Sequence, residues 1–374
     1  TTEIYTLSLH DALPISVWMP ALAFRANAEE RSSRTIKMRY WQYDLQLKHT
    51  WTIARGSRNT ATVTFVEIEQ DGIKGIGEAA VSTAARYGET QETVRSFLAR
   101  VNLEQFQDPF RLDEILTYVD SIAPENYAAK TALDIALHDW VGKKLGTPLY
   151  RMWGLSKEKT PITTFSISID TPEVMMRKVE EAKEYPILKI KVGKENDKEI
   201  ITAVRKMTDK PLRVDANEGW KTKELALERI KWMADQGVEF IEQPMPTDRL
   251  EDTAWLRERV EMPIIADESV KRSKEIRLLK DAFDGINIKL MKCGGMREAL
   301  KMIHTARSLG MKVMMGCMIE SSVAISAAAQ LSPLIDYADL DGNLLVSNDP
   351  YRGSTVVDGK IVLNENSGIG VTSA

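Results

Sequence analysis

ILKIKVG at residues 187–193 is the first of four stretches that decide the fold, followed by PLRVDAN (211–217), VEFIEQP (238–244) and PIIADES (263–269). Each stretch is short, mainly apolar and typical of a buried strand. The residues between them have the periodicity of amphipathic helices, as in LALERIKWMADQG (225–237), which ends at a glycine. Strands that alternate with helices predict an α/β fold with a parallel sheet.

The same alternation continues outward in both directions. One more strand candidate precedes these four and three follow them: ITTFSISI (162–169), GINIKLMKCGG (285–295), KVMMGCMIES (312–321) and YADLDG (337–342). Eight such units favour a closed parallel barrel. A doubly wound open sheet would also alternate, but no GxGxxG pattern follows any early strand. We therefore predict a (β/α)7–8 barrel of the TIM type over residues 156–344.

The residues before the barrel have a different pattern. Residues 40–53 and 60–79 alternate between apolar and polar side chains, and Asp71-Gly72 predicts a hairpin turn. Helical periodicity follows at about 92–101 and again over 126–146. An antiparallel sheet followed by helices predicts a separate α+β domain.

The end of the chain returns to this strand and turn pattern, with a second hairpin predicted around Asp358-Gly359. We expect residues 345–374 to rejoin the first domain. The prediction is thus an α+β domain over 38–155, completed by the C-terminal tail, and a barrel over 156–344.

The first residues are set apart from the fold. Residues 6–16 read TLSLHDALPIS, which is the in-frame translation of a common sequencing-adapter oligonucleotide. Residues 17–28 fit either read-through before a start at Met38 or the end of an export signal, because Ala26-Asn27-Ala28 matches a small-x-small cleavage site. We expect residues 1–37 to be a non-native or signal-like leader without ordered structure. We expect a cytoplasmic protein, with export to the periplasm as the alternative if 17–28 is a truncated signal.

Composition excludes several classes of function. A formal net charge of −4 gives no reason to expect nucleic acid as a partner. No stretch approaches the roughly 20 apolar residues of a membrane-spanning helix. The two cysteines, Cys293 and Cys317, form no CxxC pair, and none of the four histidines lies in an HExxH motif. Oxygen ligands and lysines therefore remain as the chemistry to look for.

Three carboxylates follow successive strands of the predicted barrel. Asp215, Glu242 and Asp267 are each about one βα unit apart, so neighbouring strands would present them to one point at the barrel mouth. Three converging carboxylates repel one another unless a cation binds them. An all-oxygen site with room for substrate suits a single Mg²⁺ ion.

Lysines flank this acidic cluster on both sides. Lys189 and Lys191 alternate with apolar residues on the second strand and point inward, and Lys289 follows the sixth strand across the barrel. A metal between two lysine sources suggests removal of a proton next to a carboxylate, with one lysine taking the proton and the other returning one from the opposite face. Proximity of Lys189 to Lys191 and to Mg²⁺ should lower a lysine pKa toward neutrality.

LKIKVG, RVDANEGW, IEQP, ADES and INIKLMKCGG together resemble the enolase superfamily, and specifically its muconate-lactonizing subgroup. The resemblance runs from about Met38 to the C-terminus. It implies that the α+β domain caps the barrel, that Lys191 and Lys289 are the acid/base pair, and that Lys189 gives electrostatic support. It also implies that Asp215, Glu242 and Asp267 bind Mg²⁺.

YADLDG at the eighth strand points to the substrate. Asp339 and Asp341 suit a substrate with an ammonium group and would oppose a dicarboxylate. The dipeptide epimerases resemble this chain in that motif, which implies 1,1-proton transfer at the α-carbon of the C-terminal residue of a dipeptide, expected to be L-Ala-D/L-Glu. That substrate implies murein peptide metabolism, that is, recycling of cell wall peptides. HTWTIARGSRNT resembles the family's specificity loop, in which Arg58 is the first candidate for the glutamate side chain and Arg55 the second.

Some residues could have a structural role only, and the protein could have another function. We expect Asn217 and Glu268 to orient the ligands or lysines, whereas Glu320 and Lys292 could serve the site or only the structure. A cycloisomerase or an o-succinylbenzoate-synthase-like lyase would share the lysines and the metal site but would not need Asp339 and Asp341. A non-catalytic peptide-binding barrel is the second alternative. The sequence leaves open whether the protein forms a homo-oligomer.

Overall fold

A computed structural model describes residues 35–53, 56–82 and 87–374. The predicted leader at 1–37 and Arg55 therefore lie largely or wholly outside the described residues. Residues 35–374 form one compact unit. Within the described ranges, no helix is long and apolar enough to cross a membrane.

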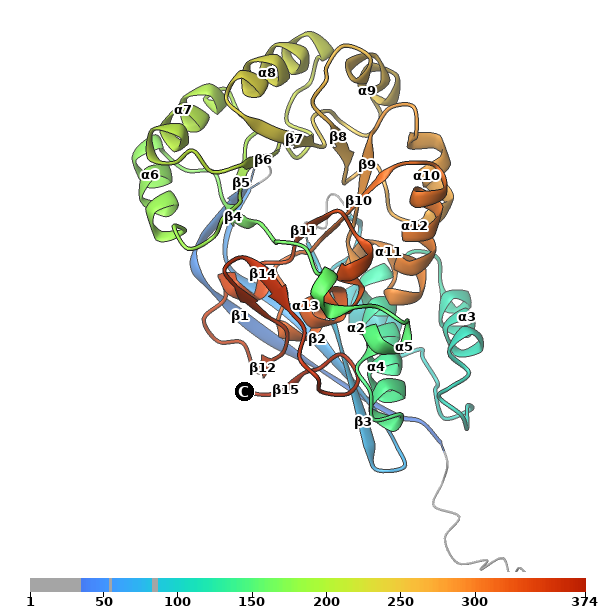
Figure 1. Cartoon of the computed structure of the whole chain (residues 1–374). Coiled ribbons are helices and arrows are strands. Elements are labelled where there is room, and N and C mark those ends of the chain that lie inside the picture. The colour runs from blue at the N-terminus through green and yellow to red at the C-terminus, as the bar shows by residue number, and fades with distance from the viewer. Residues whose placement is uncertain (1–34, 54–55, 83–86) are drawn as a thin grey trace, which may run out of the picture. The chain divides into compact units, whose positions relative to one another are not determined.

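The centre of the protein is an eight-stranded parallel sheet that nearly closes into a barrel, surrounded by helices (Figure 1). All eight predicted strands are present and pair in chain order: β4 (Phe165–Ile167), β5 (Leu188–Lys191), β6 (Leu212–Asp215), β7 (Val238–Glu242), β8 (Ile264–Ala266), β9 (Gly285–Ile288), β10 (Lys312–Gly316) and β11 (Tyr337–Asp339). A backbone bridge between Thr163 and Ala338 brings the first and last strands together. The predicted barrel is confirmed.

Helices follow the strands, as their amphipathic periodicity predicts. They are α6 (Pro172–Glu181), α7 (Asp197–Met207), α8 (Lys223–Asp235), α9 (Leu250–Arg257), α10 (Ser273–Leu279), α11 (Leu290–Cys293), α12 (Met296–Ser308) and α13 (Ser322–Leu331). Local signals set their ends: the Thr222 side chain caps α8, and Gly237 follows that helix with φ of 71°. Each of these helices buries apolar side chains in the core.

Before the barrel, three antiparallel strands pack against helices: β1 (Lys37–Ile53), β2 (Gly56–Gln70), β3 (Ile73–Ala80), α2 (Gln91–Leu98), α3 (Leu112–Ile122) and α4 (Tyr127–Lys144). The turn at Asp71-Gly72 is confirmed, with φ of 54° and 72°. Helix α4 lies directly on β3, because a Cβ at Gly75 or Gly77 would come within 2.1 Å or 1.9 Å of an α4 carbonyl oxygen. The sequence showed helical periodicity at α2 and α4 but not the helix at α3.

The remaining elements are short: α5 (Leu149–Met152), η1 (Lys157–Lys159), η2 (Ser332–Leu334), η3 (Gly342–Leu345), β12 (Tyr351–Arg352), β13 (Thr355–Val357), β14 (Lys360–Val362) and β15 (Thr372–Ser373). β13 and β14 form the predicted hairpin at Asp358-Gly359. The tail contacts the first sheet, since Ser347 N–H donates to the Gln46 carbonyl at 2.9 Å and Tyr43 Oη donates to the Asn348 carbonyl at 2.8 Å. The boundaries 38–155, 156–344 and 345–374 stay predictions.

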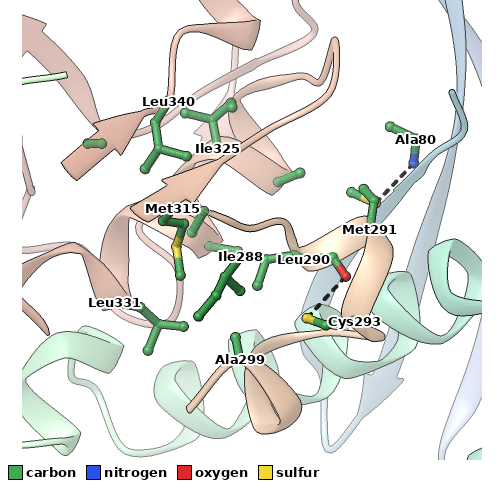
Figure 2. Close-up of a cluster of buried hydrophobic side chains, with 14 of the residues drawn as sticks. Ala80, Ile288, Leu290, Met291, Cys293, Ala299, Met315, Ile325, Leu331 and Leu340 are labelled. Carbon is green, nitrogen blue, oxygen red and sulfur yellow. Dashed lines mark hydrogen bonds between the residues drawn. The ribbon is translucent and has the colours of Figure 1, made fainter. Parts of the chain in front are cut away.

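Buried side chains join the antiparallel domain to the barrel. The backbone N–H of Ala80, at the end of β3, lies 3.3 Å from the sulfur of Met291 in α11 (Figure 2). Ile288, Met315 and Ile325 belong to the same buried cluster. The methionine-rich run at β10 is therefore a packed strand, as its apolar character indicates.

Glu78 of β3 makes a polar contact across the same junction. Its carboxylate accepts hydrogen bonds from the backbone N–H groups of Ser321 at 2.9 Å and Ala324 at 3.1 Å, at the start of α13. A carboxylate at a helix N-terminus satisfies otherwise unpaired donors. Glu78 was not singled out from the sequence, because nothing in the strand pattern shows which helix it will meet.

Candidate active site

The three predicted carboxylates meet at the carboxyl ends of β6, β7 and β8. Asp215, Glu242 and Asp267 are buried, and each offers an oxygen within 4.8 Å of the others. Register explains part of this convergence, because Asp215 pairs directly with Glu242 across neighbouring strands. The residues present therefore fit a hard divalent cation, which prefers such a set of oxygen ligands.

Hydrogen bonds hold these carboxylates in place. Asn217 N–H donates to Asp215 Oδ1 at 2.8 Å, and Asn287 Nδ2 donates to Glu242 Oε1 at 2.7 Å. Burial, together with the charge of Asp215, raises the pKa of Glu242 to about 7. Each carboxylate therefore disfavours the ionised form of the others, whereas a bound cation would favour the ionised form of all three.

Lys191 and Lys289 face this cluster from different sides of the barrel. Lys191 ends β5 and Lys289 directly follows β9, and three strands separate β5 from β9 in the sheet. Lys191 Nζ lies 2.6 Å from Asp215 Oδ2, and Lys289 Nζ lies 2.7 Å from Asp267 Oδ2. Both lysines line the same cavity, so a carbon held there can meet an amine on either side.

Lys189 lies deeper and is fully buried among carboxylates. Its Nζ is 2.6 Å from Glu242 Oε2, 2.6 Å from Asp339 Oδ2 and 3.3 Å from Asp215 Oδ2. Burial alone would lower the pKa of Lys189, but these three negative charges outweigh it and raise the pKa well above its usual range. Lys189 is thus a permanent positive charge that holds the acids together.

Lys289 also has a raised pKa. Burial lowers the pKa of Lys289, but the adjacent Asp267 carboxylate outweighs burial and raises it well above the usual range. A divalent cation bound to Asp267 would act in the opposite direction, because it neutralises the same carboxylate. A lowered lysine pKa was expected only for the neighbouring pair Lys189 and Lys191, and that expectation left out the carboxylates that pair with Lys189 and raise its pKa.

Lys292 also belongs to this cluster. Its Nζ donates to the side chain and to the backbone carbonyl of Asp267 and is fully buried. Burial lowers the pKa of Lys292, with Asp267 opposing that effect. Of the two alternatives that the sequence left open, this contact favours a role in holding a metal-ligand candidate.

Asp339 and Asp341 both line the cavity but have different neighbours. Asp339 is ion-paired to Lys189 and accepts hydrogen bonds from the hydroxyls of Thr164 and Ser166. Asp341 accepts from Ser166 N–H at 2.6 Å, and no ion pair joins it to a cation in the described ranges. Burial, together with the charge of Asp339, raises the pKa of Asp341 to about 6.

Arg58 enters the cavity from β2, at the tip of the β1–β2 hairpin. Burial lowers the pKa of Arg58, which indicates a guanidinium partly removed from water. No carboxylate of the described residues forms an ion pair with Arg58. The alternative candidate, Arg55, lies in the part of this loop that the structure does not describe.

Asn217 and Glu268 are close to one another, as expected for residues that orient the site. Asn217 Nδ2 donates to Glu268 Oε1 at 3.2 Å, and Asn217 also lines the cavity. Glu320 is buried near both Glu78 and Lys289 and accepts a hydrogen bond from Met318 N–H at 2.8 Å. Burial, together with the charge of Glu78, raises the pKa of Glu320 to about 8.

Several contact residues were missed in the sequence. Asn287 holds Glu242, and Thr164 and Ser166 hold Asp339. Strand alternation could have found them, because Asn287 lies two residues before Lys289, and Thr164 and Ser166 occupy alternate positions of β4 and the residues before it. Cys317 is half-buried and lines the cavity, whereas Cys293 is buried.

Comparison with known proteins covers nearly the whole described chain. The family described as mandelate racemase / muconate lactonizing enzyme, N-terminal domain, matches residues 36–154, and the family described as enolase C-terminal domain-like matches residues 174–374. The chain is 56% identical over 337 residues to the L-Ala-D/L-Glu epimerase of Bacteroides thetaiotaomicron, covering 90% of this chain and 88% of that protein. It is 44% identical to an L-Ala-D/L-amino acid epimerase of Pedosphaera parvula, covering 87% and 95%.

Two solved structures have the same architecture. A substrate-liganded L-Ala-D/L-Glu epimerase from Bacillus subtilis is similar with a TM-score of 0.86 and 31% identity, covering 91% of this chain and 99% of that one. A dipeptide epimerase from Enterococcus faecalis, complexed with Mg and L-Leu-L-Tyr, is similar with a TM-score of 0.83 and 36% identity, covering 90% and 99%.

Proposed function

Because the chain belongs to the mandelate racemase / muconate lactonizing enzyme family of the enolase superfamily, we propose that it is a magnesium-dependent dipeptide epimerase acting on L-Ala-D/L-Glu. The reaction is 1,1-proton transfer at the α-carbon of the C-terminal residue. This substrate places the enzyme in the recycling of cell wall peptides. The relatives named as L-Ala-D/L-Glu epimerases support the same assignment.

One observation carries the choice of substrate: two charges of opposite sign face the cavity without an ionic partner among the described residues. The other charged side chains of its lining, Lys191, Lys289 and Asp339, are each ion-paired. Arg58 and Asp341 are not. A ligand that carries both an ammonium group and a carboxylate away from the reacting centre satisfies both charges, and an Ala-Glu dipeptide has these groups.

Each group of site residues has a separate role, which follows from its position. Asp215, Glu242 and Asp267 would hold Mg²⁺, which when bound supplies positive charge to the substrate α-carboxylate and to the negative charge that develops beside it. Lys191 and Lys289 are the acid and base, one on each side of the α-carbon. Asp341 receives the ammonium group, Asp339 adds negative charge beside it while holding Lys189, and Arg58 receives the side-chain carboxylate.

The alternatives have less support from the site. A cycloisomerase or an o-succinylbenzoate-synthase-like lyase would share the lysines and the metal site but would not need Asp339 and Asp341, whose charges oppose a dicarboxylate substrate. A non-catalytic peptide-binding barrel has no use for two lysines on opposite sides of three carboxylates. Each of these alternatives predicts no exchange of a dipeptide α-proton, so the following test separates them from the epimerase.

The test is exchange of the α-proton in deuterated solvent. The purified protein with Mg²⁺ and L-Ala-L-Glu in D2O should lose the glutamate α-proton signal in the NMR spectrum and gain the signals of L-Ala-D-Glu. Replacement of both Lys191 and Lys289 by alanine should stop exchange. If the wild type with Mg²⁺ exchanges no α-proton in a panel of acidic, apolar and basic dipeptides, the proposal is wrong.

A further inference from the structure

Lys191 and Lys289, the two proposed bases, have their backbones held in different ways. Lys191 lies inside the sheet: it pairs with Asp215 of β6, and the next residue, Val192, donates its N–H to the Asp215 carbonyl at 2.9 Å. Lys289 is the first residue after β9, because the pairing of that strand ends at Ile288. The position of Lys289 therefore depends on the residues that follow it.

Lys289 is followed by α11, a helix of a single turn. The backbone N–H groups of Lys292 and Cys293 donate to the Lys289 carbonyl at 2.9 Å and 3.2 Å, so the backbone of the base belongs to this turn. One turn of helix is not stable alone, because its few hydrogen bonds do not offset the cost of fixing its backbone. Packing against another element is therefore needed to hold it in place.

Helix α4 of the antiparallel domain lies against α11. Thr131 of α4 is fully buried, and its hydroxyl oxygen lies 2.6 Å from the carbonyl oxygen of Leu290 and 2.8 Å from that of Tyr127, one turn earlier in α4. The Leu290 carbonyl also accepts a hydrogen bond from the backbone N–H of Gly294 at 3.0 Å, which closes α11. Thr131 thus contacts the turn at the residue directly after Lys289.

Asp134, about one turn further along α4, caps the next helix. Helix α12 starts after Gly295, which has no side chain with which to cap it. The Asp134 carboxylate instead accepts hydrogen bonds from the backbone N–H groups of Met296 at 2.6 Å and Arg297 at 3.3 Å, donors that a helix start otherwise leaves unpaired. A Cβ at Gly295 would lie 2.3 Å from Asp134 Cγ, so this close approach requires glycine.

The antiparallel domain therefore holds both sides of the segment that contains Lys289. Thr131 contacts α11 and Asp134 contacts the start of α12, and the backbone N–H of Ala80 adds a contact with the sulfur of Met291 at 3.3 Å (Figure 2). The backbone of Lys191, by contrast, belongs to the ladder between β5 and β6, to which α4 contributes no strand.

We propose that Thr131 and Asp134 are positioning residues for Lys289, so that the docking of the antiparallel domain sets the place of one base and not of the other. The inference rests on the proposed epimerase function and gives α4 a part in it. Proton transfer needs the lysine nitrogen within hydrogen-bond reach of the substrate, and a displacement of about 1 Å can lower a rate by about a hundredfold. Loss of either contact should therefore slow the proton transfer made by Lys289.

Exchange of the α-proton in D2O, measured separately for L-Ala-L-Glu and L-Ala-D-Glu, tests the proposal. Lys191→Ala and Lys289→Ala first assign the diastereomer that faces each lysine, because each variant should exchange only the diastereomer that faces the remaining lysine. The initial exchange rates of both diastereomers are then measured in Thr131→Val, which loses the hydroxyl, and in Asp134→Asn, which loses the charge.

Two controls accompany these variants. Thr131→Ser keeps the hydroxyl and should exchange both diastereomers at nearly the rates of the wild type. Thr253→Val is the matched control, because Thr253 of α9 is also a buried threonine whose hydroxyl donates to a carbonyl four residues earlier, that of Arg249, at 3.0 Å. Thr253→Val should leave the ratio of the two exchange rates unchanged.

In folded Thr131→Val or Asp134→Asn we expect exchange of the diastereomer that faces Lys289 to fall by about tenfold or more, while exchange of the other stays nearly unchanged. A contact that only stabilises the fold would slow both diastereomers equally. Equal losses for both, or unchanged rates for both in the folded variants, would therefore overturn the proposal. Melting temperature and circular dichroism identify the folded variants, and either variant alone can decide. A wild type that exchanges neither diastereomer would overturn the epimerase assignment itself.

Discussion

Arg58→Ala is the sharpest test of why this site would prefer glutamate. Arg58 is partly buried in the cavity, and Lys191 and Lys289, the other cations of its described lining, are already paired with Asp215 and Asp267. No other cation of the described lining is therefore available to take the side-chain carboxylate after the substitution.

The magnitude follows from that geometry. Removing one partner of a desolvated charge pair costs about 2–5 kcal/mol, because the other charge stays buried and unpaired. Since about 1.4 kcal/mol corresponds to a tenfold change, we expect kcat/KM for Ala-Glu to fall by two to three orders of magnitude, or roughly 3–4 kcal/mol. The loss for Ala-Leu should be much smaller, because its side chain has no charge to leave unpaired.

The assay compares both dipeptides in three proteins. The matched control is Arg39→Ala, which removes an exposed arginine from the same hairpin, where it pairs with Glu67 at 2.8 Å outside the cavity. The control should change kcat/KM for neither substrate by more than about twofold, because an exposed ion pair outside the cavity contacts no substrate group and contributes little. An equal loss for Ala-Glu and Ala-Leu in Arg58→Ala would refute the reasoning; Arg58 would then be structural and Arg55 the next candidate. A wild type that prefers apolar or cationic second residues would refute the glutamate assignment while leaving the epimerase intact.

Three further predictions concern the metal, the bases and stability. Asp215→Asn or Glu242→Gln should abolish activity and weaken Mg²⁺ binding measured by calorimetry while circular dichroism stays unchanged, and full turnover after EDTA treatment would contradict the metal assignment. Replacing Lys191 or Lys289 by alanine should stop epimerisation in both directions yet leave exchange of the one diastereomer whose α-proton faces the remaining lysine; equal exchange of both diastereomers by both variants would contradict the two-base assignment. Because Glu320 has a raised pKa of about 8 in the folded protein, its contribution to stability is present below its unfolded pKa and is lost as pH rises through 8. Glu320→Gln should therefore raise the melting temperature more at pH 9 than at pH 5. The corresponding gain in the free energy of unfolding should be larger at pH 9 by about 4 kcal/mol. A parallel pH dependence of stability in the wild type and the variant would contradict this prediction.

Much of the fold and of the site could be predicted because the information is local. A strand of a parallel barrel is short, and its last residue is followed at once by a loop, so the ligand candidates can be located by counting strand ends. Asp215, Glu242 and Asp267 are such residues, and the structure brings all three together. The hairpins at Asp71-Gly72 and Asp358-Gly359 are predicted for the same reason, because a two-residue turn with positive φ is encoded by the two residues themselves.

What could not be predicted depends on contacts between distant segments. Strand alternation points Lys189 and Lys289 inward, but it does not say which carboxylate each will meet, so the raised pKa values of these lysines were not anticipated. The contact of Glu78 with α13 joins residues more than two hundred positions apart and depends on how the antiparallel domain packs on the barrel. Glu320 follows β10, and its position in the sequence does not show that its carboxylate lies near Glu78 as well as near Lys289.

The eighth-strand motif illustrates why pairing in three dimensions matters more than residue type. Asp339 and Asp341 are identical in chemistry and both reach the cavity, so the sequence treats them as equivalent ligands for an ammonium group. In the structure Lys189 already neutralises Asp339: burial raises the pKa of Asp339, but the charges of Lys189 and Lys191 outweigh burial and hold that pKa below its usual range. Asp341, in contrast, has a pKa raised to about 6 and no ion pair among the described residues. A buried carboxylate with a raised pKa lacks positive charge in its surroundings, and an incoming ammonium group supplies that charge. The same reasoning applies with the opposite sign to Arg58, whose pKa burial lowers. Asp341 and Arg58 therefore gain most electrostatic stabilisation from a ligand with an ammonium group at one end and a carboxylate at the other. For this reason the charge pattern favours an acidic dipeptide over a neutral or cationic one.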